Sequence, residues 1–290
     1  AVDIAPVHSL VARVMDGVGM PDLIIQPGAS PHEYSLRPSE AAALQNSDLV
    51  FWIGPGLTPW LTDTIETLAK DASVTSLLDL DGTVQLDFRE GALFEVHDHD
   101  DHDDHDDHDD HDDHDDHDDH DDHDPHAWLS PKNAITWLNV IAGQLSAADP
   151  DNAGTYFANA AAGRTEIELL ISEVTATLDR VRGGRFIVFH DAYQYFEMDF
   201  NFPASGAISV SDASDPGPAR ITEIRDRISQ QGIDCVLAEP QFNPDLIATI
   251  LDGTDSRTGI IDPLGSDLEP GASLYRELIR NLSTALASCM

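Results

Sequence analysis

The segment from His97 to His126 holds the side chains most able to do chemistry. Ten histidines lie among eighteen aspartates between His97 and Asp124, and the tract runs directly into Pro125 and His126. Imidazole suits zinc, copper and nickel, and carboxylate adds a harder oxygen donor. We interpret the tract as a metal-capturing segment, and a solvated charge run is the alternative. Its histidines are His97, His99, His102, His105, His108, His111, His114, His117, His120 and His123.

Such a tract cannot form a packed core, because it offers almost no apolar side chain and its aspartates repel one another at neutral pH. We therefore expect a disordered loop at about residues 95–125. A flexible array of interchangeable ligands cannot impose one coordination geometry. The precise metal site is expected elsewhere, in the folded part of the chain.

The rest of the chain alternates short apolar runs with helical patterns, which is typical of parallel sheets covered by helices in an α/β fold. Strands are expected at 2–7, 23–26, 49–53, 74–77, 186–189, 233–238 and 258–261. Helices are expected at 8–19, 39–46, 57–70, 131–147, 152–182, 192–200, 218–231, 244–251 and 273–287.

The pattern at 152–182 is unusually long. Its apolar residues recur at spacings of three and four, so one apolar stripe is continuous over roughly 45 Å of helix. We predict two similar, mostly parallel α/β domains, at 1–150 and 183–290, joined by one backbone helix at 151–182. The stripe consists of Ile167, Leu170, Ile171, Val174, Leu178 and Val181.

Four potential metal ligands follow predicted strands or precede a predicted helix. They are His32, His126, His190 and Asp262. Since the carboxyl ends of strands line the binding crevice of open α/β sheets, the two domains would bring these side chains together in the cleft between them. Three imidazoles and one carboxylate satisfy tetrahedral zinc. The alternatives are ordinary hydrogen-bonding roles for the histidines and a turn-capping role for Asp262.

The acidity of the chain limits the classes of partner that it can bind. The formal charge is −39, and −21 remains without the eighteen aspartates of the tract. Such a field repels nucleic-acid phosphates and anionic membrane surfaces and attracts cations. No apolar run approaches the length of a membrane span. The start at Ala1, without methionine or signal peptide, predicts an exported protein whose signal peptide has been removed, or a trimmed chain.

The chain has two cysteines, Cys235 and Cys289. They fit no CxxC pattern, and one disulfide is the simplest use of an even count in an oxidising compartment. Closing a loop of this length could contribute roughly 4 kcal/mol. Two unrelated buried thiols are the alternative.

Several segments together resemble the zinc solute-binding proteins of ABC transporters, the ZnuA type of the metal-binding cluster A-I family. The resemblance spans the whole chain in order. It implies that His32, His126 and His190 bind zinc, that Asp262 can be the fourth ligand, and that the cysteines form a family disulfide. The matching segments are GASPHEYSLRPS, LQNSDLVFWIGPG, DPHAWLSP, FHDAYQYFE, CVLAEPQF and IDPLG.

Three positions separate this chain from other members of the family. Manganese-binding relatives carry glutamate where His190 stands, so the histidine favours zinc. Some members use a glutamate immediately before the first histidine, and Pro31 here shifts the fourth position to Asp262 or a water. Some bind a second ion with a histidine where Ala207 stands, so an auxiliary ion would need the tract alone.

The resemblance implies capture of periplasmic Zn²⁺ and its delivery to a membrane permease with its ATPase, without bond-breaking chemistry. We expect a monomer with one tight ion and weaker ions in the tract, which would be an accessory collector or sensor. Binding should fail in acid, because ligand histidines must be neutral. Copper competes with zinc at many nitrogen sites. The long helix should restrain hinge motion, so release would involve the loops around His32 and His126.

Two other functions compete with transport. A zinc hydrolase would use three histidines, an open fourth position and Glu239 as general base, but the chain lacks an HExxH motif. A hydrogen bond to the metal site is the simpler role for Glu239. The second competitor is a periplasmic metal buffer without a permease.

Overall fold

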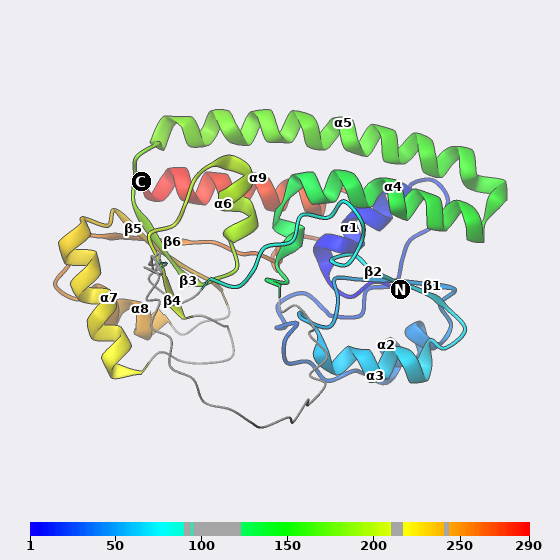
Figure 1. The fold of residues 1–290 in the computed structure, drawn as a ribbon, viewed down its shortest axis with the longest axis horizontal. Helices are drawn as coiled ribbons and strands as arrows, with labels where there is room; N and C mark the ends of the chain where they lie inside the picture. Colours follow the sequence, from blue (N-terminus) through cyan, green and yellow to red (C-terminus); the bar gives the residue numbers. More distant parts are fainter. Residues whose placement is uncertain (90–93, 95–122, 210–216, 241–243) are drawn as a thin grey trace, which may run out of the picture.

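A computed structural model provides the three-dimensional structure of the chain and describes residues 1–89, 94, 123–209, 217–240 and 244–290. Most of the predicted loop, including the tract histidines from His97 to His120, lies outside these residues. The described part is an α/β fold with two parallel sheets and a long helix that runs along one side of the molecule (Figure 1). The predicted fold class is confirmed.

The first sheet contains two short parallel strands, in which Leu49 pairs with Ser73 and Trp52 with Ser76. Val2 adds isolated parallel bridges to Leu23 and to Phe51. The elements of this half are α1 (Ala5–Val14), α2 (Pro38–Gln45), β1 (Leu49–Trp52), α3 (Pro59–Leu68) and β2 (Ser73–Ser76).

The predicted strands at 2–7 and 23–26 are wrong, since each is reduced to a single bridging residue, Val2 in the first and Leu23 in the second. Helix α1 begins at Ala5, and Pro6 suits a first turn because it lacks the N–H that a helix start leaves unpaired. Nearly all of α1 is buried. Its first three residues, Ala5 to Val7, carry no polar side chain, and a short apolar run of this kind cannot be told from a buried strand, which explains why the helix was predicted to start only at His8.

The second sheet has four parallel strands in the order β4-β3-β5-β6. Strand β4 escaped prediction because three residues are too short to show a period. The elements of this half are β3 (Phe186–His190), α6 (Gln194–Phe200), β4 (Ala207–Ser209), α7 (Pro218–Gln231), β5 (Cys235–Ala238), α8 (Pro244–Leu251), β6 (Arg257–Ile260) and α9 (Leu274–Cys289).

Helices α4 (Pro131–Ala148) and α5 (Ala153–Leu178) link the two sheets. The Oγ of Ser130 accepts from the N–H of Asn133 and caps α4, which begins at Pro131 as predicted. Helix α5 has 26 residues, or roughly 39 Å of helix. The 3₁₀ turns η1 (Ala127–Leu129), η2 (Pro150–Asn152) and η3 (Asp179–Val181) complete the connections.

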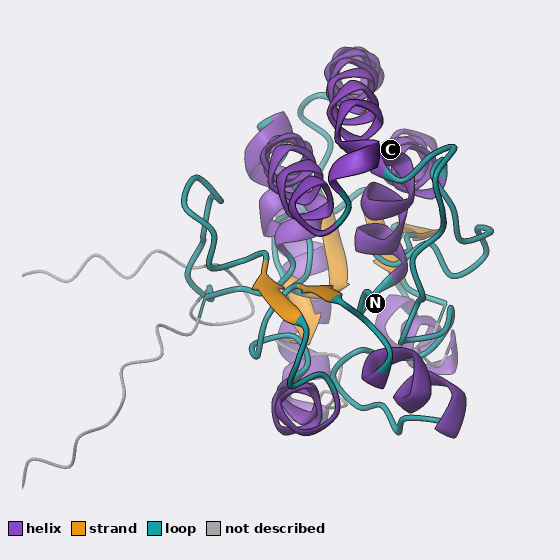
Figure 2. Ribbon diagram, turned by 90° about the vertical axis from the view of Figure 1, so that its right-hand side faces the viewer, coloured by secondary structure: helices purple, strands orange, loops and turns teal. Residues whose placement is uncertain are grey.

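The main hydrophobic core is shared by both halves. It contains Phe51 and Trp137 from the first half, Leu170 from α5, and Phe186 and Leu278 from the second. Helix α9, at the end of the chain, packs on both α5 and α1. Figure 2 shows helices on both sides of the strands. The division at residues 150 and 182 stays a prediction, since packing crosses it.

The predicted disulfide is confirmed. Cys235, at the start of β5, is bonded to Cys289, at the end of α9. Gly259 of β6 lies beneath this bond, and a Cβ there would lie 3.2 Å from the Sγ of Cys289 and 2.9 Å from a methyl of Leu237. Glycine is therefore required where α9 approaches the sheet. None of the described helices is long and apolar enough to cross a membrane.

Candidate metal centre

The predicted ligands come from four different segments. His190 is the last residue of β3, His126 directly precedes η1, Asp262 lies two residues beyond β6, and His32 lies in the loop before α2. His126 and His190 are only 6% and 3% exposed. The structure thus places buried imidazoles from both halves at the carboxyl side of the sheets, where α/β folds bind ligands.

The three histidines lie together, with His126 in the middle. The Nε2 atoms of His126 and His190 are 3.4 Å apart, and the ring centroids of His32 and His126 are 5.8 Å apart. Two nitrogens bound tetrahedrally to one zinc ion at about 2.05 Å lie about 3.3 Å from each other. The His126–His190 pair therefore already has the spacing of two corners of a zinc tetrahedron.

A buried carboxylate holds the far nitrogen of each of these two rings. Nδ1 of His126 lies 2.7 Å from Oδ1 of Asp124, and Nδ1 of His190 lies 2.6 Å from Oε1 of Glu239. A carboxylate that accepts from Nδ1–H leaves the Nε2 lone pair for a metal, as is usual for histidine ligands. The predicted hydrogen-bonding role of Glu239 is confirmed.

In the sequence Asp124 is the last aspartate of the tract, and its hydrogen bond to His126 was not predicted. The carboxyl also accepts from the backbone N–H of His126 at 2.9 Å. Burial raises its pKa to about 7, although this hydrogen bond from the His126 N–H and the positive charge of Arg89 act in the opposite direction. The Asp-Pro-His sequence was the available signal, because an Asp two residues before a histidine can reach both its ring and its N–H.

Asp262 caps the turn that follows it, which was the alternative raised by its position. Its Oδ1 accepts from the N–H groups of Leu264 and Gly265, and its Oδ2 accepts from the N–H and hydroxyl of Ser266. It also lies near the centre. Burial raises the pKa of Tyr193, and the negative charges of Glu239 and Asp262 raise it further. A ligand role for Asp262 stays a prediction.

Among the residues that the structure describes, no three His, Cys, Asp or Glu side chains already form a complete set of metal ligands. The His126–His190 pair has the spacing for zinc, whereas the His32 ring and the Asp262 carboxylate do not complete the set. A third and a fourth ligand would require local adjustment of their loops.

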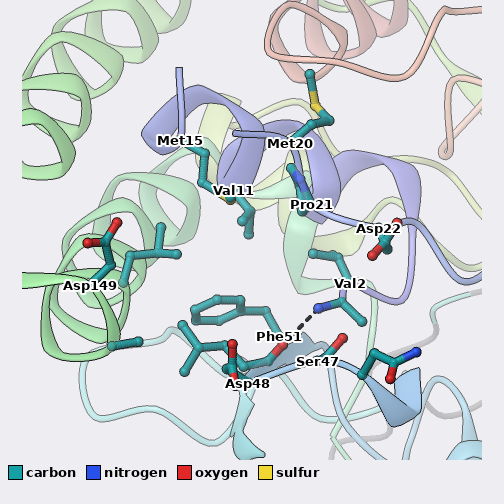
Figure 3. A pocket seen from close by; sticks show the side chains of 15 residues that line it. Val2, Val11, Met15, Met20, Pro21, Asp22, Ser47, Asp48, Phe51 and Asp149 are labelled. Atoms are coloured by element: carbon teal, nitrogen blue, oxygen red, sulfur yellow. Dashed lines mark hydrogen bonds between the residues drawn. The ribbon is translucent and has the colours of Figure 1, made fainter. Parts of the chain in front are cut away.

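A separate cavity of about 280 Å³ lies between α1, α4 and the start of β1 (Figure 3). Its lining includes Val11, Met15, Asp48, Phe51 and Asp149, and none of the predicted ligands. Asp48 directly precedes β1, so this cavity lies at the amino end of the strand. It is therefore distinct from the candidate metal centre.

The sequence profile of the family described as zinc-uptake complex component A, periplasmic, matches residues 1–289. The chain belongs to this family. The high-affinity zinc uptake system protein ZnuA of Brucella abortus (strain 2308) is 48% identical over 302 residues, covering 100% of this chain and 90% of the relative. The protein of the same name from Paracoccus denitrificans (strain Pd 1222) is 46% identical over 294 residues, covering 99% and 90%.

Solved structures share the fold of this family. A crystal structure of ZnuA superposes with a TM-score of 0.78 at 21% identity and covers 99% of this chain and 97% of that one. A zinc-bound ZnuA with residues 138–173 of its own chain deleted gives 0.77 at 21% identity, covering 99% and 96%. The resemblance to ZnuA-type solute-binding proteins of ABC zinc uptake systems is confirmed, and the family implies a periplasmic location.

Proposed function

We propose that this ZnuA-type chain captures one Zn²⁺ as its cargo and delivers it to the membrane permease of an ABC transporter. His32, His126 and His190 would bind the ion, and Asp262 or a water would take the fourth position. The observation that carries this proposal is the 3.4 Å separation of the His126 and His190 Nε2 atoms. The Asp124 and Glu239 carboxylates support it, because they direct both Nε2 lone pairs toward the same place.

The two remaining ligands would come from loops that can adjust. The indole N–H of Trp60 donates to the Pro31 carbonyl at 2.8 Å and supports the His32 loop from α3. Asp262 would give up one of its turn contacts to reach the ion. Because both halves share one core, we infer that capture and release involve these loops and not a wide opening of the two sheets.

The tract would serve as an accessory collector of zinc. Its last histidine, His123, forms an antiparallel bridge with Asp87, and its Nδ1 lies 3.1 Å from the Asp87 carboxylate. The Asp124 N–H donates to the Leu86 carbonyl at 2.8 Å. The C-terminal end of the tract is therefore held beside the residues that orient His126. Tethering there would raise the local concentration of tract-bound zinc at the centre.

Catalysis is the weaker proposal. The hydrolase hypothesis needs Glu239 as a general base, but its Oε1 is hydrogen-bonded to His190. Relatives at 46–48% identity are named as zinc uptake proteins.

A metal buffer without a permease predicts that deleting the gene leaves growth under zinc limitation unchanged. Delivery to a permease predicts impaired growth under the same conditions. We also propose that the protein acts as a monomer.

Zinc titration by calorimetry tests the proposal on three proteins: the intact chain, a deletion of residues 97–122, and the triple variant His32→Ala, His126→Ala, His190→Ala. The deletion retains His123, so the contact with Asp87 at the base of the tract is preserved. We expect the deletion to keep one tight ion and the triple variant to lose it. Tight binding that survives in the triple variant and disappears in the deletion would make the tract the principal site.

A further inference from the structure

Arg89 joins two buried carboxylates next to the metal centre. Its Nε donates to Oδ2 of Asp191 at 2.9 Å, and its Nη2 donates to the other oxygen of Asp191. Its Nη1 and Nη2 also donate to the two oxygens of Glu197 at 2.7 and 3.1 Å. One guanidinium thus holds both carboxylates in bidentate contacts, a geometry that lysine cannot reproduce.

This cluster is nearly withdrawn from water. The side chains of Arg89, Asp191 and Glu197 are 17%, 9% and 5% exposed. Burial disfavours the charge on Arg89, but the two carboxylates outweigh it and raise the Arg89 pKa above its ordinary value. The positive charge of Arg89 also opposes the rise that burial causes in the pKa of Asp124. Without Arg89, two carboxylates would be buried with no opposite charge to compensate them.

The cluster is in contact with both histidine ligands through neighbouring groups. Asp191 directly follows His190 at the end of β3, and Glu197 lies in the first turn of α6 and accepts from the Ala204 N–H at 3.0 Å. Arg89 therefore fixes the turn between His190 and α6. On the other side, the backbone just before Arg89 pairs with Asp124, which binds the ring of His126.

We propose that Arg89 is a positioning residue for zinc: by clamping Asp191 and Glu197 it fixes His190 of the second half relative to His126 of the first. Tyr195 of α6 reinforces this connection. Its hydroxyl donates to the Asp124 carbonyl at 2.7 Å and accepts from the Leu86 N–H at 3.0 Å. The inference rests on the proposed function, because it concerns the same metal centre.

The test compares Arg89→Met and Arg89→Lys with Arg13→Met. Arg13 is a matched control: it is 16% exposed and makes a bidentate contact with Glu166 between α1 and α5, away from the centre. Zinc affinity is measured by competition with a chelator. The visible absorption of bound Co²⁺ reports the coordination geometry, which a loss of stability alone would not change. Thermal unfolding of the zinc-free proteins measures stability.

Arg89→Met should weaken zinc binding by up to about 10-fold, less than the 10- to 100-fold loss that follows removal of a direct partner of a metal ligand, and should alter the Co²⁺ spectrum. Arg89→Lys should fold, keep the charge and lose part of the affinity. Arg13→Met should lose stability and keep both the affinity and the spectrum. If Arg89→Met does not fold, Arg89→Lys decides the question through the same two measurements.

Wild-type affinity and an unaltered Co²⁺ spectrum in the Arg89 variants would overturn this inference and leave the proposed function standing. An equal loss of affinity in Arg13→Met would also overturn it, since the effect would then follow stability. Failure of the proposed function would be separate: the triple histidine variant would still bind zinc tightly.

Discussion

The indole Nε1 of Trp128 donates to the carbonyl of Pro263 at 2.7 Å, although the two residues are 135 positions apart. Trp128 lies two residues after His126, and Pro263 directly follows Asp262. Trp128 is 1% exposed, and its own carbonyl accepts from the hydroxyl of Tyr275 in α9. This hydrogen bond ties the segment of one predicted ligand to the segment of another across the two halves.

Replacing Trp128 with Phe should remove this tie and leave the buried Pro263 carbonyl without its donor. We expect a loss of about 1–3 kcal/mol in the free energy of unfolding, because a buried carbonyl loses its hydrogen bond. Zinc affinity should fall several-fold as the Asp262 turn becomes less fixed. Urea denaturation and zinc titration measure the two effects.

Trp137→Phe is the matched control for this variant. Trp137 is also fully buried, and its Nε1 donates to Thr83 at 2.9 Å, within the first half. Its loss should reduce stability to a similar extent and leave zinc affinity unchanged. Equal effects of both variants on zinc affinity would contradict a specific role for Trp128.

Glu239→Gln should weaken zinc binding by about 10-fold or more. Glutamine keeps the size of the side chain and one oxygen acceptor, but it loses the charge that strengthens the 2.6 Å contact with His190 Nδ1. Competition with a zinc chelator measures the change. Glu166→Gln, which alters the contact with Arg13 away from the centre, is the control. Unchanged affinity in Glu239→Gln would show that this carboxylate does not support the ligand.

Removing the disulfide should lower stability without abolishing zinc binding. The bond between Cys235 and Cys289 closes a loop across 54 positions, so replacing both cysteines with alanine should cost roughly 4 kcal/mol. Urea denaturation measures this loss. Zinc affinity of the folded variant should stay within a few-fold of wild type. A large loss of affinity at low urea would mean that the bond also shapes the metal centre.

Asp3 should make stability depend on pH. It is 1% exposed, and burial raises its pKa to about 7, although the N–H groups of Ile53 and Ile4 donate to its carboxyl and oppose the shift. Between about pH 4 and 7 the folded chain then keeps a proton that the unfolded chain has released. Its contribution should therefore be complete below about pH 4 and be lost as pH rises through 7, by up to about 1.4 kcal/mol per pH unit.

Asp3→Asn cannot ionise and isolates this effect. Urea denaturation without zinc, from pH 5 to pH 8, measures the unfolding free energy of both proteins. The value for wild type should fall relative to that of Asp3→Asn as pH rises to about 7, and the difference should then become constant. A difference that does not change with pH would show that Asp3 stays ionised throughout, held by its two N–H donors.

Local patterns were sufficient for much of this protein. The 3.6-residue period predicted α5, the helical pattern at 131–147 predicted α4, and the count of two cysteines predicted the disulfide. The family motifs around His32, His126 and His190 singled out the histidines that the structure brings together. These signals survive in the sequence because each depends on residues close along the chain or on residue type alone.

The contacts that position these histidines were decided by tertiary structure. Glu239 reaches His190 across 49 positions, Arg89 reaches Asp191 across 102, and Trp128 reaches Pro263 across 135. The misassigned strand at 2–7 has a related cause, since the first three residues of α1, Ala5 to Val7, are buried in the core and carry no polar side chain that would show a helical period. The periodicity of a segment does not predict which distant segments it will contact, because these contacts depend on how the two halves pack around their shared core.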